Sequence, residues 1–371
     1  MYSQPIPVSI ILGTRPEAIK LAPVIQKFQA SSIFDTQVIL TGQHREMVDQ
    51  VMQLFGLTAN HDLAIMQPKQ TLTNITCWSL EGLETLFQQT QPRLVLVQGD
   101  TTTAFAAALA AFYQKIPVGH VEAGLRTDSI YNPYPEEANR RLISQITTLH
   151  FAPTTLAVEN LQKSGVLGEI HHTGNTVIDA LLTVADRNPP CEIPGLDWSK
   201  YRTILSTVHR RENWGEPLKD IAAGFLKVLE AFPDTALLLP LHRNPTVREP
   251  LKAVLGDHPR VFLTEPLDYT ALIGAMQRCH LLLTDSGGLQ EEAPALGKPV
   301  LVLRETTERP EAVMAGTARL IGTDAERIFA EASELLSNET VYQQMATAIN
   351  PFGDGHASER ILSSAIDFLK G

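Results

Sequence analysis

The chain has 371 residues, of which 44% are hydrophobic and 19% are charged, and its formal net charge is −11. A chain of this length usually folds as two domains, and this composition is typical of soluble globular proteins. The acidic balance argues against nucleic acid or a membrane surface as a partner, because both attract basic proteins. No apolar run reaches the roughly 18 residues of a transmembrane helix, so none is predicted.

The cysteines and the N-terminal segment indicate the compartment. Three cysteines, Cys77, Cys191 and Cys279, lie far apart, and none has the close spacing of a zinc site. The first residues, MYSQPIPV, lack the basic and apolar regions of a secretory signal. We therefore predict a cytoplasmic protein with neither a structural disulfide nor a bound metal.

Short apolar runs alternate with longer amphipathic stretches along the first half of the chain. A helix-like segment follows each run, as in TTTAFAAALAAFYQK at 101–115. Runs this apolar indicate strands that are covered on both faces, as in parallel sheets. The runs occupy residues 8–12, 36–41, 93–98, 116–121, 149–153 and 170–174.

The same alternation resumes after a proline-rich segment at 186–201, with runs at 202–209, 235–242, 260–266, 279–285, 299–304 and 318–323. Two successive sets of strand–helix units predict an α/β fold of two Rossmann-like, doubly wound parallel-sheet domains that face each other across a cleft. We expect an N-terminal domain at 1–175, a C-terminal domain at 176–357, and a C-terminal helix at 358–371 that could pack on either domain, with the N-terminal domain as one possibility.

The stretch LLLTDSGGLQEEAPALG at 281–297 is the strongest indication of a nucleotide site. A buried strand would end at Asp285, and Ser286, Gly287 and Gly288 would form the turn into a helix. Glycines let backbone N–H groups approach a phosphate at a helix N-terminus. Glu292, one turn into that helix, could accept both hydroxyl groups of a ribose. The alternative is a plain strand–helix turn.

Three basic clusters end other strands of the second half: TVHRREN at 207–213, LHRNP at 241–245 and RETTERPEA at 304–312. On an acidic protein they indicate anion binding, because an arginine can pair with a pyrophosphate through two hydrogen bonds. For any one arginine alone, a solvated surface charge is the alternative.

The turn GTRPEA opens the first helix of the chain. Thr14 and Glu17 have the spacing of a capping box, and Pro16 suits the first helical turn. Arg15 has no such structural reason and is expected to point at the cleft, with Lys20 next along the helix. The Gly-x-Gly-x-x-Gly fingerprint of dinucleotide sites is absent from the sequence, so no dinucleotide cofactor is predicted.

Three acidic residues end elements of the first half: Asp100 in VLVQGDTTT, Glu122 in GHVEAGLRT and Glu136 in NPYPEEANR. Together they favour acid/base chemistry on a sugar, because clustered carboxyl groups can be given different pKa values. Each also has a structural interpretation. Asp100 could cap a helix, Glu122 could pair with Arg126, and Glu136 could simply be exposed.

Taken together, these motifs resemble those of the non-hydrolysing UDP-N-acetylglucosamine (UDP-GlcNAc) 2-epimerases. The resemblance implies a glycosyltransferase-B type of fold, a homodimer, and interconversion of UDP-GlcNAc and UDP-N-acetylmannosamine (UDP-ManNAc) without a cofactor, for surface polysaccharide synthesis. The implied ligands are UDP-GlcNAc, UDP-ManNAc and UDP. From residue 13 to beyond 350, the matching stretches are GTRPEAIKLAPV, TGQHREM, QGDTTT, GHVEAGLRT, PYPEEANR, TGNTVIDA, HRREN, TDSGGLQEEAP, GKPVLVLRETTERPEA and GDGHASERI.

The resemblance also implies roles for individual residues. Its chemistry begins with loss of the C2 proton and of UDP, passes through a 2-acetamidoglucal, and ends with re-addition of UDP. It gives the acid/base work to Asp100, Glu122 and Glu136, with His209 beside the leaving diphosphate. It places the UDP on Arg15, Lys20, Ser286, Gly287, Gly288, Glu292 and Arg309.

Bacterial members of the family imply a second, activating UDP-GlcNAc site. This chain departs from the expected pattern at Glu46, where we expect glutamine, at Lys69, where arginine is common, and at Leu272, where an aromatic residue would lie beside the uracil. An acid near a diphosphate would weaken binding at the second site. The positions of that site are Gln43, Glu46, Gln70, Glu136, Arg210 and His242.

Three other functions fit part of the pattern. A glycosyltransferase of the same fold would share the nucleotide site but would not need three acids. A hydrolysing 2-epimerase would release free ManNAc, and the stretch HVEAGLRT resembles the non-hydrolysing enzymes better. A non-catalytic nucleotide-sugar sensor would keep the basic clusters without the acids.

Overall fold

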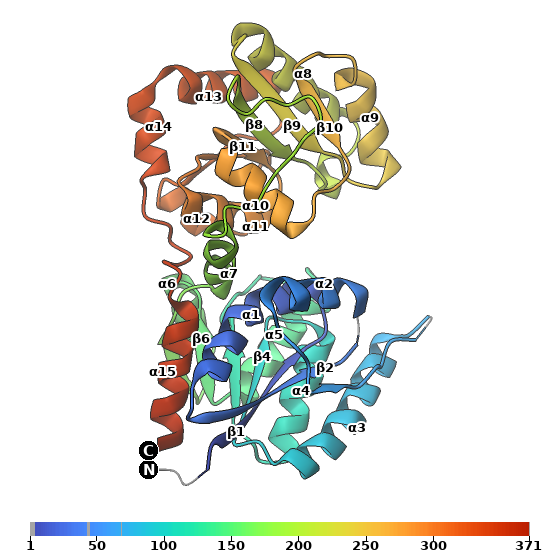
Figure 1. Ribbon diagram of the computed structural model, residues 1–371, viewed down its shortest axis with the longest axis vertical. Helices are drawn as coiled ribbons and strands as arrows, with labels where there is room; N and C mark the ends of the chain where they lie inside the picture. The colour runs from blue at the N-terminus through green and yellow to red at the C-terminus, as the bar shows by residue number, and fades with distance from the viewer. Residues whose placement is uncertain (1–3, 43–44, 68, 371) are drawn as a thin grey trace. The chain divides into compact units, whose positions relative to one another are not determined.

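The computed structural model describes residues 4–42, 45–67 and 69–370 (Figure 1). The chain divides into two compact units. Unit 1 comprises Met1–Ala180 and Phe352–Gly371, and unit 2 comprises Leu181–Pro351. Unit 2 is therefore inserted between two segments of unit 1.

The described part of unit 1 contains a seven-stranded parallel sheet with the order β3-β2-β1-β4-β5-β6-β7. Its strands are β1 (Ile6–Leu12), β2 (Phe34–Leu40), β3 (His61–Asp62), β4 (Leu94–Gln98), β5 (Val118–Val121), β6 (Leu149–Ala152) and β7 (Glu169–His172). Its helices are α1 (Arg15–Ala30), α2 (Arg45–Phe55), α3 (Leu72–Thr90), α4 (Thr102–Tyr113), α5 (Glu136–Ile146), α6 (Thr155–Lys163), α7 (Thr176–Ala185), which runs past the boundary, and α15 (Ala357–Lys370).

Unit 2 contains a six-stranded parallel sheet with the order β10-β9-β8-β11-β12-β13. Its strands are β8 (Arg202–Thr207), β9 (Thr235–Pro240), β10 (Val261–Thr264), β11 (Leu281–Thr284), β12 (Val300–Val302) and β13 (Ala318–Leu320). Its helices are α8 (Glu216–Ala231), α9 (Pro245–Leu255), α10 (Tyr269–Arg278), α11 (Gly287–Glu292), α12 (Pro310–Met314), α13 (Ala325–Ser337) and α14 (Glu339–Ala346), with short 3-10 turns at Arg211–Asn213 and Ala293–Leu296.

Each unit is built around its own apolar core. In unit 1, Ile11 and Val95 of neighbouring strands pack with Phe87 of α3 and Ala107 of α4. In unit 2, strand residues such as Leu239 and Leu283 belong to one buried cluster with residues of α8 and α13. Burial of a large aliphatic or aromatic side chain contributes about 1.5–3 kcal/mol, so each sheet is a stable support for the loops at its edges.

The order of strands reverses at one point in each sheet. β1 lies between β2 and β4, and β8 lies between β9 and β11. Loops diverge at the carboxyl ends of such strand pairs, and ligands of open α/β sheets bind there. These loops carry Arg15 and Asp100 in unit 1, and His209 and Ser286 in unit 2.

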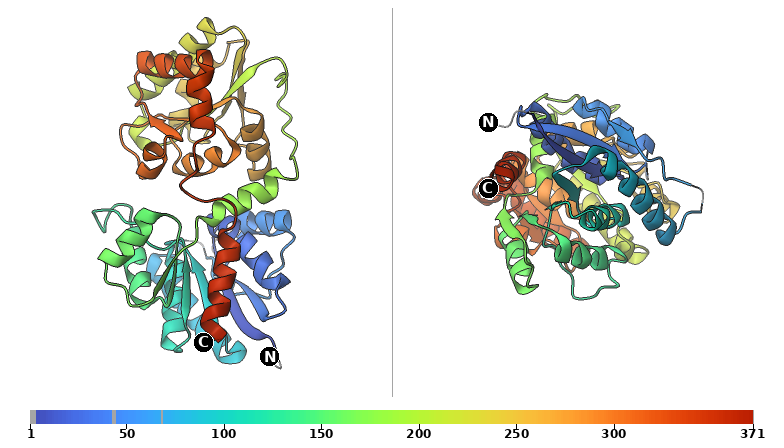
Figure 2. Two further views of the ribbon diagram at one scale, coloured as in Figure 1. Left: turned by 90° about the vertical axis from the view of Figure 1, so that its left-hand side faces the viewer. Right: turned by 90° about the horizontal axis from the view of Figure 1, so that it is seen from below.

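The structure confirms the predicted fold of two Rossmann-like domains of the glycosyltransferase-B type. Each of the twelve apolar runs overlaps a strand. The two-residue strand β3 was not predicted, because His61 and Asp62 form no apolar run. The tail helix was predicted from 358 onward; α15 begins at Ala357 and packs against α1 within unit 1 (Figure 2).

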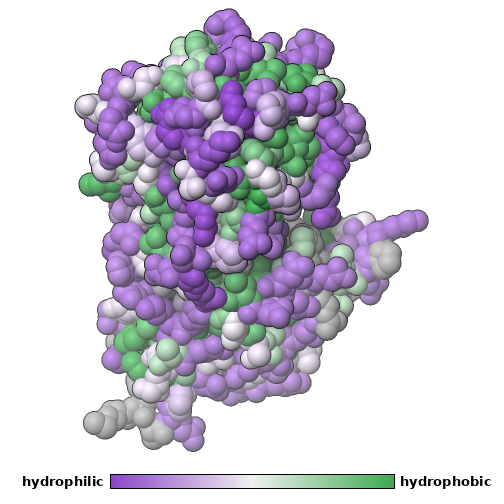
Figure 3. Space-filling model, turned by 45° about the horizontal axis from the view of Figure 1, so that its top comes forward, coloured by the Kyte–Doolittle hydropathy of each residue, from purple (hydrophilic) through white to green (hydrophobic). Residues whose placement is uncertain are grey.

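The surface is predominantly polar on the face drawn in Figure 3. Within the residues that the structure describes, the helices are all too short or too polar to cross a membrane.

Candidate active site

The Glu17 carboxylate joins two strand-end turns of unit 1. Its Oε2 accepts hydrogen bonds from the backbone N–H groups of Gly13 and Thr14 at 2.7 Å each, and the Thr101 hydroxyl donates to Oε1. Burial raises the pKa of Glu17, and these hydrogen bonds oppose the rise. The glutamate of the predicted capping box thus also fixes the turn after β1 to the turn after β4.

Asp100 follows β4 and is bound by Arg140 from the second turn of α5. The Arg140 Nε and Nη2 atoms lie 2.8 and 2.6 Å from Asp100 Oδ2, and Asn139 donates to the Asp100 carbonyl at 2.9 Å. The interpretation of Asp100 as a helix cap is wrong, because Thr101 holds that position and accepts a backbone N–H of the first turn of α4. Asp100 therefore lies beside α5, the helix that begins at Glu136.

Glu122 follows β5 in a strained backbone conformation, with φ +65° and 8% exposure. Lys20 Nζ lies 2.6 and 2.7 Å from its two carboxylate oxygens, and Gln98 also donates to it. Arg126, the partner considered from the sequence, instead donates to a backbone carbonyl and a serine hydroxyl. Lys20, predicted as a contact of UDP, is thus an ion-pair partner of Glu122 in this structure.

Glu136 is the first residue of α5 and is partly exposed. Its Oε2 is buried and has no hydrogen-bond partner within the described part of the chain. Leaving a buried acceptor unsatisfied costs about 1–3 kcal/mol, and such atoms are rare in native proteins unless a ligand or water completes them. The next residue, Glu137, is fully buried and binds Arg140 and Arg141. The three predicted acids therefore have three different environments.

In unit 2, Asp285 fixes the position of His209. The buried Asp285 carboxylate lies 3.0 Å from His209 Nδ1 and accepts the backbone N–H groups of His209 and Arg210 and the Asn213 amide. Burial opposes ionisation of Asp285, but the hydrogen bonds from His209 and the backbone outweigh it and hold the pKa below its usual range. Because Asp285 contacts Nδ1 of His209, the other ring nitrogen, Nε2, is the one that could contact a ligand.

The predicted phosphate turn connects β11 to α11. Ser286 occupies the cap position of α11 and is partly exposed, and Gly288 is exposed. A Cβ atom added to Gly287 would meet Arg210 Nη2 at 3.5 Å, so this arginine lies against the turn. Arg210 Nη2 is also 3.6 Å from Glu308. The structure thus places a guanidinium, two glycines and a hydroxyl at one strand end.

The remaining predicted UDP contacts have mixed environments. Glu292 is 7% exposed, and the Tyr269 hydroxyl lies 3.4 Å from its Oε1. Arg309 donates through Nε to Glu291, the neighbour of Glu292. Arg15 is the first residue of α1 and is partly exposed, without an ion pair to another described residue.

The residues predicted for a second nucleotide site are spread over both units. Gln43 lies outside the described residues. Glu46 is exposed in the first turn of α2, and Gln70 lies just before α3. The His242 ring stacks on the His209 ring, with 6.0 Å between the ring centroids. His242 is therefore a neighbour of the candidate catalytic histidine.

A family model described as UDP-N-acetylglucosamine 2-epimerase matches residues 26–365. The chain belongs to the UDP-N-acetylglucosamine 2-epimerase family. The UDP-N-acetylglucosamine 2-epimerase of Escherichia coli K12 is 49% identical over 367 residues, which cover 96% of this chain and 97% of that protein. The family resemblance predicted from the motifs is confirmed.

Solved structures of 2-epimerases share the fold of the whole chain. The UDP-GlcNAc 2-epimerase of Neisseria meningitidis, bound to UDP-GlcNAc, has a TM-score of 0.86 and 46% identity, covering 98% of this chain and 100% of that chain. The UDP-GlcNAc 2-epimerase of Methanocaldococcus jannaschii, in complex with UDP-GlcNAc and UDP, has a TM-score of 0.74 and 33% identity. The match covers 98% of this chain and 100% of that chain.

Three contacts in this member of the 2-epimerase family were missed by sequence reasoning. They are Lys20 to Glu122, Arg140 to Asp100, and Asp285 to His209. The paired residues are 102, 40 and 76 positions apart in the sequence. A local pattern contains no signal for such pairs, although the place of Asp285 at the end of a predicted buried strand could have marked it as a candidate site residue.

Proposed function

We propose that the protein interconverts UDP-GlcNAc and UDP-ManNAc by epimerisation at C2, without net hydrolysis. The observation that carries the proposal is the set of three acids in different environments: Asp100 paired with Arg140, Glu122 paired with Lys20, and Glu136 with an unsatisfied oxygen. Epimerisation needs one group to remove a proton and another to deliver one, so acids in different environments suit it. Family membership supports the substrate class.

The proposed reaction begins at C2 of the sugar. A base takes the C2 proton, the C–H electron pair forms a C1–C2 double bond, and the C1–O pair leaves with UDP. This yields a 2-acetamidoglucal and UDP. Protonation of C2 on the opposite face and attack of a UDP oxygen at C1 give the epimer. No water is consumed and no electron is transferred to a cofactor. We assign the proton steps to Asp100, Glu122 and Glu136 as a set.

In this proposal unit 2 holds the nucleotide. Backbone N–H groups of the turn 286–288 and the Ser286 hydroxyl bind the diphosphate, and Glu292 accepts the ribose hydroxyl groups. His209, oriented by Asp285 through Nδ1, offers Nε2 to the leaving diphosphate. The proposed cationic contacts of UDP are Arg15, Lys20 and Arg309.

Proton NMR of UDP-GlcNAc with the protein in D₂O tests the reaction. The expected result is deuterium at C2 of both sugars while UDP-ManNAc accumulates. If UDP-ManNAc forms with an unlabelled C2, the proposed loss of the C2 proton is wrong. Release of free ManNAc would instead identify a hydrolysing enzyme.

We also propose a homodimer. Phe112 and Tyr113, adjacent at the end of α4, are 50% and 67% exposed and offer apolar surface that a second subunit could cover. Sedimentation equilibrium should therefore give about twice the 40.8 kDa of one chain. A mass of one chain at micromolar concentration would contradict this. Activation through a second UDP-GlcNAc site stays a prediction.

A further inference from the structure

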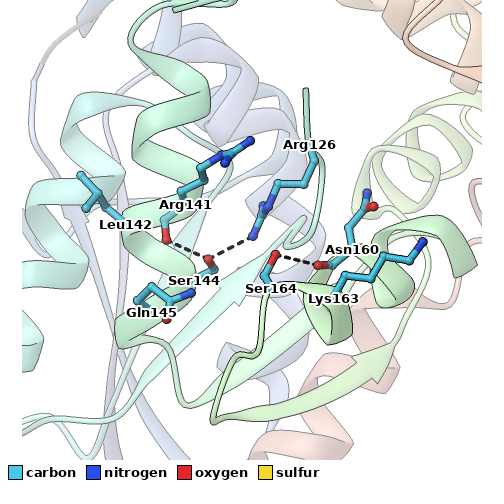
Figure 4. A pocket seen from close by; sticks show the side chains of 8 residues that line it. All are labelled: Arg126, Arg141, Leu142, Ser144, Gln145, Asn160, Lys163 and Ser164. Atoms are coloured by element: carbon cyan, nitrogen blue, oxygen red, sulfur yellow. Dashed lines mark hydrogen bonds between the residues drawn. The ribbon is translucent and has the colours of Figure 1, made fainter. Parts of the chain in front are cut away.

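Unit 1 has a pocket of about 470 Å³ bounded by α5, α6 and the loop after β5 (Figure 4). It is lined by three cations and, among the described residues, by no carboxylate, although the whole chain carries a net charge of −11. None of these residues belongs to the proposed catalytic, UDP or second-site sets. The lining residues are Arg126, Arg141, Leu142, Ser144, Gln145, Asn160, Lys163 and Ser164.

Two of the three cations have an acidic neighbour beside the pocket. Arg141 Nε lies 2.8 Å from the buried carboxylate of Glu137. Lys163 Nζ lies 3.4 Å from Glu159, and both of these side chains are largely exposed, at 71% and 51%. Exposed pairs of this kind contribute about 0–1 kcal/mol, so Lys163 is readily drawn to another anion.

Arg126 differs, because its partners are uncharged. Its Nη1 donates to the Leu125 carbonyl at 2.8 Å and its Nη2 to the Ser144 hydroxyl at 3.0 Å, and the structure records no carboxylate within ion-pair distance in the residues it describes. Burial lowers the pKa of Arg126, Glu137 opposes this shift, and the neighbouring arginines add to it. The half-buried guanidinium of Arg126 thus has uncharged hydrogen-bond partners, and Glu137 acts on it only from beyond hydrogen-bond distance.

The positive charge of Arg126 also reaches two buried histidines. Burial is the main cause that lowers the pKa of His120 to about 4 and of His150 to about 3, and the Arg126 charge lowers both further. Neutral imidazoles add no negative charge near Arg126. The two neutral imidazoles therefore leave the positive charge of the pocket lining unchanged.

We propose that this pocket binds a phosphate-type oxyanion, held mainly by Arg126 and Lys163. The planar guanidinium matches the geometry of phosphate oxygens, and the ammonium group adds a second charge. The ligand is either free phosphate or the phosphate group of a larger metabolite, which share this chemistry. The inference does not rest on the proposed epimerase activity.

Isothermal titration of inorganic phosphate into the full chain, saturated with UDP and held at constant ionic strength, tests the proposal. UDP fills the proposed nucleotide site, so the remaining heat reports other sites. We expect one saturable event. Arg126→Lys, which loses the planar fork, should weaken binding at least about tenfold, and Lys163→Ala at least about threefold. Arg93→Ala, which removes a cation from another pocket of unit 1, is the matched control and should bind normally.

A second titration with glycerol 3-phosphate distinguishes the two sources. Tighter binding of the ester supports a phosphorylated metabolite, and tighter binding of inorganic phosphate supports the free ion. Absence of saturable heat in the wild type, or equal affinity in all variants, would overturn the site. Lys163 is exposed, so Lys163→Ala decides the question if Arg126→Lys does not fold. If UDP itself does not bind, the nucleotide site fails, and the same titration without UDP still tests this pocket.

Discussion

At the scale of single residues, the contacts of the three acids in unit 1 distinguish them more than their chemical type does. Asp100 forms an ion pair with an arginine, and Glu122 binds a lysine and a glutamine. Glu136 has one buried oxygen without a hydrogen-bond partner among the described residues. Amide substitutions keep the size and shape of these side chains and remove only the ionisable oxygen. They can therefore separate substrate binding from proton transfer.

Asp100→Asn and Glu136→Gln should each lower C2 deuterium exchange by at least about 100-fold. Their UDP affinity should stay within about tenfold of the wild type, or roughly 1.4 kcal/mol, because general acid/base groups act mostly in the transition state. The measurements are exchange by NMR, UDP titration calorimetry and melting temperature on the same samples.

The control for these variants is Glu84→Gln, which changes an exposed acid of α3 and should leave exchange unchanged. Near-normal exchange in Asp100→Asn would contradict its catalytic assignment. If the melting temperature of Asp100→Asn falls sharply, the loss of exchange is explained by the broken ion pair with Arg140 instead.

At the scale of elements, the strands were predictable and the side-chain pairs were not. The run 93–98 predicted the strand that the structure shows as β4, because a strand buried on both faces consists mostly of apolar residues. The edge strand β3 has no such need and escaped prediction. The ion pair of Lys20 with Glu122 had no signal in the sequence, since only the folded chain brings α1 to the end of β5.

The buried histidines of β5 and β6 should make the protein acid-sensitive. His120 and His150 are register neighbours, 1% and 0% exposed, with pKa values lowered from 6.5 to about 4 and about 3, mainly by burial. Below pH 6.5 the unfolded chain therefore binds more protons than the folded one. Their contribution to stability is full above pH 6.5 and falls by about 1.4 kcal/mol per pH unit per histidine as the pH drops toward 4.

Urea unfolding at pH 7.5 and pH 5.5, on the wild type and on His150→Phe, measures this effect. The free energy of unfolding should fall between pH 7.5 and pH 5.5 in both proteins. The fall should be about 1.4 kcal/mol smaller in the variant, because one titrating ring is removed. Buried acids such as Glu17 have a raised pKa and so change the pH dependence of stability in the opposite direction. They are present in both proteins, so their effect cancels when the wild type and the variant are compared. Equal pH dependence would show that His150 is not buried in its neutral form.

The start of α15 depends on one buried carboxylate of α7. Asp179 Oδ1 accepts the Ser358 N–H at 2.7 Å and the Ser358 hydroxyl at 2.6 Å, and Oδ2 accepts the Ala357 N–H at 3.2 Å. Asp179→Ala leaves these donors unsatisfied and should destabilise the protein by about 2 kcal/mol or more. Ser358→Ala removes one hydroxyl and should cost about 1 kcal/mol. Equal losses in urea unfolding would show that the backbone caps contribute nothing.

At the scale of the whole molecule, the path of the chain makes the two units unequal. Unit 2 is one continuous segment, and its core cluster lies entirely between Ile204 and Met345. Unit 1 needs residues from both ends of the chain, because α15 packs on α1. In α15, Ile361 and Ala365 are completely buried and Leu369 is 8% exposed.

This difference predicts how fragments fold. Residues 181–351 alone should unfold cooperatively in urea, since they keep their whole core. Residues 1–180 alone lose α15, whose two large aliphatic side chains contribute about 3–6 kcal/mol, a large part of the 5–15 kcal/mol that stabilises a typical domain. We expect this fragment to show little cooperative unfolding by circular dichroism, and a version in which 352–371 is joined to residue 180 by a flexible linker to regain it. If 1–180 has the same free energy of unfolding as the joined version, α15 covers unit 1 without stabilising it.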